Sequence, residues 1–181
     1  MKSYDYAHRA GVCRITWHDF ARLGARLAEL VEPFQPQVIL GIARAGLFPA
    51  TLVACSLRCD LFPVRLTRRV QDQVLYDRPV WKVPVPQDVH GKIVVIIDEI
   101  ADTGQTLAMA AESTRSLGAA EVITASLVSH SWANPAPQLC SLTTDAFVIF
   151  PWDQQVFDGG KWVPHPEVVA GLKVQKRNPS G

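Results

Sequence analysis

The sequence predicts an α/β fold with a doubly wound parallel sheet. Short apolar runs rich in Val and Ile alternate with stretches of helical composition along the 181 residues. This alternation is typical of parallel strands joined by helical crossovers. The central run is apolar throughout rather than at every second position, which indicates a strand buried on both faces. With 48% hydrophobic residues, we expect residues 1–181 to form a single domain with a sizeable core.

The N-terminal half is expected to contain a helix, a strand, a second helix and a second strand. Thr16 can cap a helix over residues 17–32, in which apolar side chains share one face. The apolar run 38–42 predicts a buried strand, and Pro49 suits the first turn of the helix that follows. Residues 61–66 predict the second strand of this half.

The C-terminal half begins with a long segment, residues 70–90. Its charges and prolines show little periodicity, as is typical of a functional loop. Residues 94–98 predict the central strand, and a helix over residues 106–117 should end at Gly118, a good residue just past a helix end. The remaining expectations are strands over 122–128 and 146–150 and a frayed polar tail over 173–181.

The segment from Val94 to Leu107 carries the strongest functional signal. Its apolar run ends in two adjacent carboxylates, Asp98 and Glu99, where open α/β sheets place their ligands. Such a pair at the end of a buried strand is costly without a ligand or metal. The next loop offers hydroxyls and free N–H groups at a helix N-terminus, which favours a phosphate. A phosphorylated sugar is therefore the expected ligand; surface carboxylates beside an ordinary helix cap are the alternative.

The segment 94–106 reads Val-Val-Ile-Ile-Asp-Glu-Ile-Ala-Asp-Thr-Gly-Gln-Thr. It closely resembles the phosphoribosyl-pyrophosphate signature of type I phosphoribosyltransferases. Segments at Thr16, over 41–46 and over 145–153 are similar, in the same order, to those of the family's 6-oxopurine enzymes. The resemblance implies the type I phosphoribosyltransferase fold, with a small hood built from both chain ends. It also implies a salvage enzyme that transfers a phosphoribosyl group from phosphoribosyl pyrophosphate to guanine, xanthine or hypoxanthine, with Mg²⁺ as the metal.

The resemblance assigns the sugar phosphate to the central segment. Asp98 and Glu99 are expected to hold the ribose hydroxyls, directly or through Mg²⁺. The residues expected to grip the 5-phosphate, through backbone N–H groups and hydroxyls, are Ala101, Asp102, Thr103, Gly104, Gln105 and Thr106. Asp102 also matches the family's candidate general base, with a helix N-cap as its alternative role.

Pyrophosphate is expected at the loop after the first of the buried strands. There the small residues Ala43, Ala45 and Gly46 expose backbone N–H groups, and Arg44 offers charge-assisted hydrogen bonds. The family often has a non-proline cis peptide at this place, between Ala43 and Arg44. Arg68, in an arginine cluster just before the long loop, is a further candidate. For both arginines a solvated position is the alternative.

Base recognition is assigned to the later part of the chain. By resemblance, Phe147 stacks on the purine, the Val148 backbone meets the base edge, and Trp152 and Asp153 shape the same wall. A core position is the alternative for Phe147. His130 lies where the 6-oxopurine enzymes carry a lysine that reaches the exocyclic oxygen. Because a neutral imidazole brings no fixed charge, this departure leaves the base open, and an ordinary loop histidine is the alternative.

Composition bears on the class of protein. A net charge of +1 gives no nucleic-acid footprint, which argues against the non-catalytic alternative, a regulator of this fold that senses phosphoribosyl pyrophosphate. A same-fold enzyme acting on an unusual heterocycle is the second alternative.

We expect no membrane span and no signal peptide, and the four cysteines lack metal-binding spacing. The expected location is the cytoplasm, and the expected assembly is a homodimer or homotetramer, as in relatives.

Overall fold

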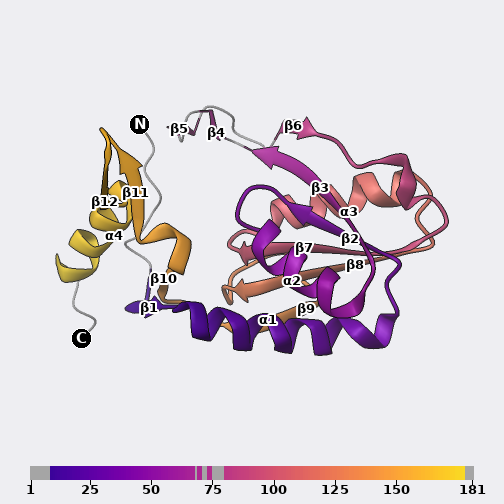
Figure 1. Ribbon diagram of the computed structural model, residues 1–181, viewed down its shortest axis with the longest axis horizontal. Coiled ribbons are helices and arrows are strands. Elements are labelled where there is room, and N and C mark those ends of the chain that lie inside the picture. The colour runs from indigo at the N-terminus through magenta and orange to yellow at the C-terminus, as the bar shows by residue number, and fades with distance from the viewer. Residues whose placement is uncertain (1–8, 68, 71–72, 75–79, 178–181) are drawn as a thin grey trace. The chain divides into compact units, whose positions relative to one another are not determined.

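The computed structural model describes residues 9–67, 69–70, 73–74 and 80–177 and divides into two compact units (Figure 1). The larger unit spans residues 23–144. The smaller unit combines the two ends of the chain, residues 2–22 and 145–181, which is the composition expected of the hood.

Six strands form the sheet of the larger unit, in the order β6-β3-β2-β7-β8-β9 (Figure 1). The strands are β2 (Val38–Ile42), β3 (Asp60–Thr67), β6 (Val80–Val83), β7 (Ile93–Ala101), β8 (Glu121–Ser129) and β9 (Leu139–Thr143). All neighbouring strands are parallel except β3 and β6. The predicted α/β fold with a doubly wound parallel sheet is therefore confirmed, except that the edge strand β6 is antiparallel to β3.

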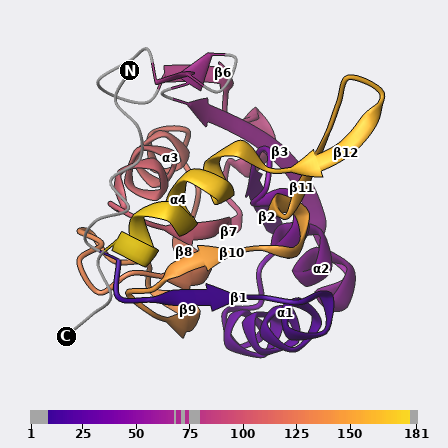
Figure 2. The same cartoon turned by 90° about the vertical axis from the view of Figure 1, so that its left-hand side faces the viewer.

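Two crossover helices cover opposite faces of this sheet (Figure 2). The helix α2 (Leu47–Leu57) connects β2 to β3, and α3 (Gln105–Ser116) connects β7 to β8. The sheet face that carries Leu40 packs in one cluster with Leu107 of α3. Gly41 points to the other face, where an added Cβ would lie 2.8 Å from the Cβ of Ala50 in α2.

The helix α1 (Trp17–Val31) belongs to the larger unit from Leu23 onwards. There Gly24 allows close approach to α2, because an added Cβ would lie 2.6 Å from Cδ1 of Leu52. The short elements of this unit are η1 (Glu32–Phe34), η2 (Gln87–Val89) and an antiparallel pair, β4 (Arg69–Val70) and β5 (Gln73–Val74). Part of the predicted long loop lies outside the described residues.

In the smaller unit, β1 (Val12–Arg14) pairs in parallel with β10 (Phe147–Ile149). The turn η3 (Pro151–Asp153) leads to an antiparallel hairpin of β11 (Gln155–Asp158) and β12 (Lys161–Pro164). The last element is α4 (Pro166–Arg177). Figure 2 shows β1 and β10 side by side.

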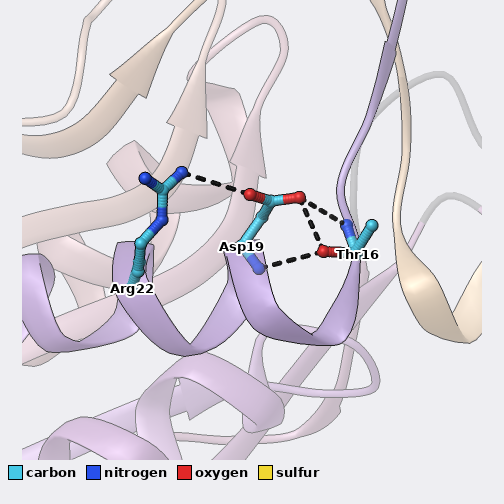
Figure 3. A network of polar contacts seen from close by, with 3 residues as sticks. All are labelled: Thr16, Asp19 and Arg22. Carbon is cyan, nitrogen blue, oxygen red and sulfur yellow. Dashed lines mark hydrogen bonds and ion pairs between the residues drawn. The ribbon is translucent and has the colours of Figure 1, made fainter.

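The start of α1 is fixed by the residue predicted to cap it. The Thr16 hydroxyl accepts a hydrogen bond from the backbone N–H of Asp19 at 3.1 Å, and the Asp19 carboxylate accepts from the Thr16 N–H at 3.1 Å (Figure 3). Arg22, one turn further on, donates to the same carboxylate at 3.1 Å. This reciprocal arrangement satisfies two N–H groups that would otherwise lack partners.

Two expectations about chain segments are wrong. The central strand does not end at Asp98, because β7 continues to Ala101 and pairs with β8 over that length. Residues 173–177 are not part of a frayed tail, because they form the end of α4. The apolar side chains Leu172 and Val174 pack against the cluster of Phe147 and Ile149, which supplies the burial that holds this helix. Residues 178–181 lie outside the described residues.

Candidate active site

The strand order creates a switch point between β2 and β7. The crossover after β2 leads to β3 on one side, whereas the crossover after β7 leads to β8 on the other. Open α/β sheets bind ligands outside the carboxyl ends of two such strands, where the loops diverge. The loop after β2 and the segment with the acid pair on β7 both lie at this point.

Gly46 brings these two segments into contact. A Cβ added to Gly46 would lie 2.8 Å from Oδ1 of Asp98 and 3.0 Å from its Cα. It would also lie 2.5 Å from the carbonyl oxygen of Ile42. Only glycine allows the loop after β2 to rest on the acid at this separation, so the predicted pyrophosphate loop and the predicted acid pair are neighbours.

The acid pair sits inside the end of β7 rather than beyond it. Asp98 is buried and Glu99 is half-buried, and the backbone N–H of Glu99 donates to Oδ1 of Asp98 at 2.9 Å. Burial raises the pKa of the Asp98 carboxyl. Burial, then the Asp98 charge and a side-chain hydrogen bond with Asp98, raise the pKa of Glu99 well above its ordinary value of 4.5. The ligand-free pair therefore favours retention of a proton on Glu99.

Arg44 supplies a positive charge that acts on Glu99 of this pair. Its side chain is exposed, and its charge opposes the upward shift in the pKa of Glu99, as the smallest of the contributions. The peptide bond between Ala43 and Arg44 is cis, as expected from the resemblance. Arg68, the other candidate for pyrophosphate, lies outside the described residues.

The predicted phosphate segment turns directly into α3. Gly104 is the N-cap, with a left-handed backbone at φ +79° and no side-chain cap, and Gln105 begins the helix. Asp102 is therefore not the N-cap, and that alternative for it is wrong. The first N–H groups of a helix have no acceptor within the helix, and Thr103, Gln105 and Thr106 are exposed or half-exposed beside them. This end of α3 has the groups and the dipole that suit an anion.

Ala101 differs from the rest of the predicted phosphate-binding set. It is buried at the end of β7, and its carbonyl oxygen accepts a hydrogen bond from the His130 N–H at 3.1 Å. The loop proper thus begins at Asp102, a residue later than the resemblance implies.

The loop between β8 and β9 contributes residues that sequence reasoning missed. The indole N–H of Trp132 donates to Oδ1 of Asp102 at 3.1 Å, and the Asn134 N–H donates to the Thr103 carbonyl oxygen at 3.1 Å. Neither residue belongs to a recognisable motif, and about thirty residues separate each from its partner. No local signal in the sequence could have revealed these contacts.

His130, the predicted base contact, is buried with 3% of its surface exposed. Its Nδ1 lies at hydrogen-bonding distance from the Thr144 carbonyl oxygen, and its ring stacks on Trp132 with centroids 4.5 Å apart. A carbonyl oxygen only accepts, so Nδ1 carries the hydrogen, and in a neutral ring Nε2 is then an acceptor. This burial favours a structural role for His130.

The other predicted base contacts lie in the smaller unit. Phe147 is buried against α4, where a Cβ on Gly171 would lie 2.6 Å from its ring. This burial matches the core position given above as the alternative for Phe147. Val148 pairs with Cys13 of β1. Trp152 stacks on Phe150 with centroids 4.9 Å apart, and Asp153 donates its N–H to the Phe150 carbonyl oxygen at 3.1 Å.

The donor set at the acid pair fits Mg²⁺ only as a partner of substrate. No group of three or more His, Cys, Asp or Glu side chains able to hold a metal ion occurs in the described part of the chain. Asp98 and Glu99 offer carboxylate oxygens, the donors that Mg²⁺ prefers, and this metal is usually held by one or two carboxylates together with substrate phosphates and water. The residues present therefore fit a magnesium ion that arrives with a phosphorylated substrate.

Comparison with known proteins identifies the family. The family model for the phosphoribosyl transferase domain matches residues 17–157, and the chain belongs to this family of pentosyl-transferring enzymes. Adenine phosphoribosyltransferase from Rhodospirillum centenum is 26% identical over 121 residues, which cover 63% of this chain and 71% of the relative.

Solved structures agree with this assignment. A purine phosphoribosyltransferase from Pyrococcus horikoshii is 31% identical, with a TM-score of 0.70, over 79% of this chain and 94% of that one. A xanthine-guanine-hypoxanthine phosphoribosyltransferase from Helicobacter pylori has a TM-score of 0.66 at 15% identity, over 80% and 93% of the two chains. The second likeness shows the fold alone.

Among the helices that the structure describes, none has the length and apolar character needed to cross a membrane.

Proposed function

We propose that this protein transfers the 5-phosphoribosyl group of phosphoribosyl pyrophosphate to a purine base and releases pyrophosphate. The observation that carries the proposal is the contact of the loop after β2 with Asp98 at the switch point. This contact places the candidate pyrophosphate loop beside the acid pair of β7, and the same segment then leads into α3. The purine class is supported by the names of the relatives, and guanine, xanthine and hypoxanthine are the acceptors we favour.

In the proposed reaction, the bond between C1 and the base nitrogen forms as the bond between C1 and the pyrophosphate oxygen breaks. The transition state is expected to resemble an oxocarbenium ion, as in glycosyl transfer generally. The 5-phosphate is held by residues 102–106 at the start of α3, and the ribose hydroxyls by Asp98 and Glu99. Arg44 binds the departing pyrophosphate. Asp98 and Glu99 would hold Mg²⁺ together with the substrate, and the metal would supply charge that neutralises the leaving group.

Asp102 is the proposed general base, which takes the proton from the purine nitrogen. General bases contribute roughly 10²–10⁴-fold to rate, so Asp102→Asn should lower kcat by about that factor while the protein still binds phosphoribosyl pyrophosphate. Retention of most of the turnover at saturating substrate would remove this role from Asp102.

The proposed base contacts Phe147, Val148, Trp152 and Asp153 remain predictions, as does His130. The hydrogen on Nδ1 of His130 points to Thr144, so a neutral ring could not donate to a 6-oxygen through Nε2. Adenine therefore belongs among the bases to be tested, as does an unusual heterocycle.

The experiment that tests the proposed function follows pyrophosphate release with phosphoribosyl pyrophosphate, Mg²⁺ and a panel of bases. Turnover with guanine, xanthine or hypoxanthine is the expected result. Turnover with adenine alone keeps the purine class and corrects the base, whereas turnover only with another heterocycle supports the second candidate. Absence of turnover with every base would contradict the proposal.

A further inference from the structure

The loop between β8 and β9 contacts each residue of the segment that leads into α3. The His130 N–H donates to the Ala101 carbonyl oxygen, and the Asn134 N–H donates to the Thr103 carbonyl oxygen, both at 3.1 Å. The indole of Trp132 reaches Asp102 between them. A Cβ on Gly104 would lie 2.0 Å from the carbonyl oxygen of Pro135. All of these contacts lie within the larger unit.

Trp132 is held in place by stacking on His130 rather than by burial in a core. It is 41% exposed, yet its ring lies nearly parallel to the imidazole of His130, at an interplanar angle of 17° and a centroid distance of 4.5 Å. His130 is itself buried and anchored to the Thr144 carbonyl oxygen. The indole therefore stacks on an imidazole that is itself held in one position. Its N–H donates to Oδ1 of Asp102 at 3.1 Å.

We propose that Trp132 is a positioning residue for Asp102, orienting its carboxylate for the reaction; this inference rests on the proposed function. A carboxylate on a loop can rotate, and a fixed N–H donor on one oxygen limits that rotation. Catalytic groups lose rate when their geometry is not held in advance. Tryptophan suits this task because its indole is a donor only and its large ring can stack at the same time.

The variant Trp132→Phe tests the proposal, because it keeps an aromatic ring over His130, although a smaller one, and removes the N–H donor. We expect kcat to fall about tenfold, the loss that corresponds to a weak hydrogen bond to a charged group, with the KM for phosphoribosyl pyrophosphate within about twofold of wild type. The matched control is Trp162→Phe, at an indole that is 65% exposed on β12 in the smaller unit. This control should leave both constants unchanged.

A double-mutant cycle separates positioning from general damage to the fold. In an Asp102→Asn background, Trp132→Phe should lower kcat by less than about twofold, because residues that act through one another are not additive. The same tenfold loss in both backgrounds would overturn the proposal, as would an unchanged kcat in the single variant. Thermal unfolding of each variant shows whether it is folded.

A crystal structure of Trp132→Phe supplies a readout that does not depend on activity. The Asp102 side chain should leave its wild-type rotamer or occupy more than one. A single wild-type rotamer in that structure would overturn the inference even if the enzyme is active. If the wild-type protein fails to use any base, the proposed function is wrong, and the rotamer then decides separately whether Trp132 positions Asp102.

Discussion

At the scale of single residues, the acid pair lowers the stability of the ligand-free protein. Asp98 is buried and Glu99 half-buried, and buried carboxyls are costly in their charged form. The raised pKa of Glu99 expresses this cost, since burial and the Asp98 charge both favour the protonated form. Binding sites often give up stability in this way.

The variant Glu99→Gln should therefore stabilise the ligand-free protein, and the gain should depend on pH. Below the ordinary pKa of 4.5, folded and unfolded chains both hold the proton, and Glu99 costs little. As pH rises through that value, the unfolded chain releases the proton while the folded chain keeps it. The free energy of unfolding of wild type then falls until pH reaches the raised pKa of the folded state. The advantage of the variant should grow over the same range.

Thermal unfolding between pH 4 and pH 8 measures this difference. The exposed Glu112 of α3 offers a matched control, because Glu112→Gln removes a carboxyl without removing a buried one. An advantage of Glu99→Gln that is flat with pH would show that the environment of Glu99 is not the cause.

Gly104 is expected to be irreplaceable for a steric reason as well as a conformational one. Both Gly104 and Gly91 have left-handed backbones, at φ +79° and φ +69°, so alanine strains each by about 1–2 kcal/mol. Only at Gly104 would the new Cβ also collide with a carbonyl oxygen, that of Pro135, at 2.0 Å. Gly104→Ala should lower the melting temperature more than Gly91→Ala and weaken binding of phosphoribosyl pyrophosphate. Equal losses of stability in the two variants would contradict this packing.

Residue patterns indicated the parts of the candidate site that lie close together in sequence, and these assignments stay predictions. Asp98, Glu99 and residues 102–106 form one continuous string with a physical rationale for each residue type. Trp132 was missed because its contact with Asp102 joins residues thirty positions apart in the chain. The burial of His130 was missed for the same reason. Its ring contacts the carbonyl oxygen of Thr144, which follows β9, whereas His130 follows β8.

At the scale of elements, the first turn of α1 depends on the reciprocal bonds of Thr16 and Asp19. Thr16→Ala removes the cap and should cost about 1 kcal/mol of unfolding free energy. The Thr16 hydrogen bonds lower the pKa of Asp19 below its ordinary value of 3.8. The stabilisation from this carboxylate is therefore present above that value and is lost as pH falls through the lower folded pKa, so the difference between variant and wild type should become smaller there. The hydrogen bond from the Asp19 N–H to the Thr16 hydroxyl does not depend on this charge and keeps part of the difference at low pH.

Thr51 provides the control for this prediction, since it is exposed in α2 and follows the start of that helix by several residues. Alanine is the better helix former in such a position, so Thr51→Ala should not lower the melting temperature. A comparable loss in both variants would show that capping is not the source of the effect.

Sequence periodicity located the buried strands best. The strand β2 has the predicted bounds because all five of its residues are apolar or glycine and all are buried. The end of β7 was misplaced because Asp98 and Glu99 are polar residues inside a strand, held there by pairing with β8. The helix α4 was missed because its polar end gave no signal, while its packing on Phe147 arises only in the folded unit.

At the scale of the whole molecule, the order of the strands defines the site. Alternation along the chain predicted a parallel sheet, but it could not predict that β2 and β7 would be neighbours. That pairing joins segments more than fifty residues apart and places the loop at Gly46 against Asp98. Pairing over such distances depends on the whole set of packing faces rather than on any local pattern.

A ligand that binds only the folded protein must stabilise it. Phosphoribosyl pyrophosphate with Mg²⁺, at about 100 times its Kd, should add about 2.7 kcal/mol to the free energy of unfolding. Removal of the metal with EDTA should abolish most of this shift, because Asp98 and Glu99 would then face the substrate's own negative charge. A full shift without metal, measured by thermal unfolding, would contradict the proposed role of the acid pair.

The most direct test of the account is a crystal structure of the protein with phosphoribosyl pyrophosphate and Mg²⁺. The 5-phosphate should lie against the first N–H groups of α3, the ribose hydroxyls and metal at Asp98 and Glu99, and pyrophosphate at the loop that carries Arg44. A molecule bound elsewhere, with the start of α3 empty, would contradict it.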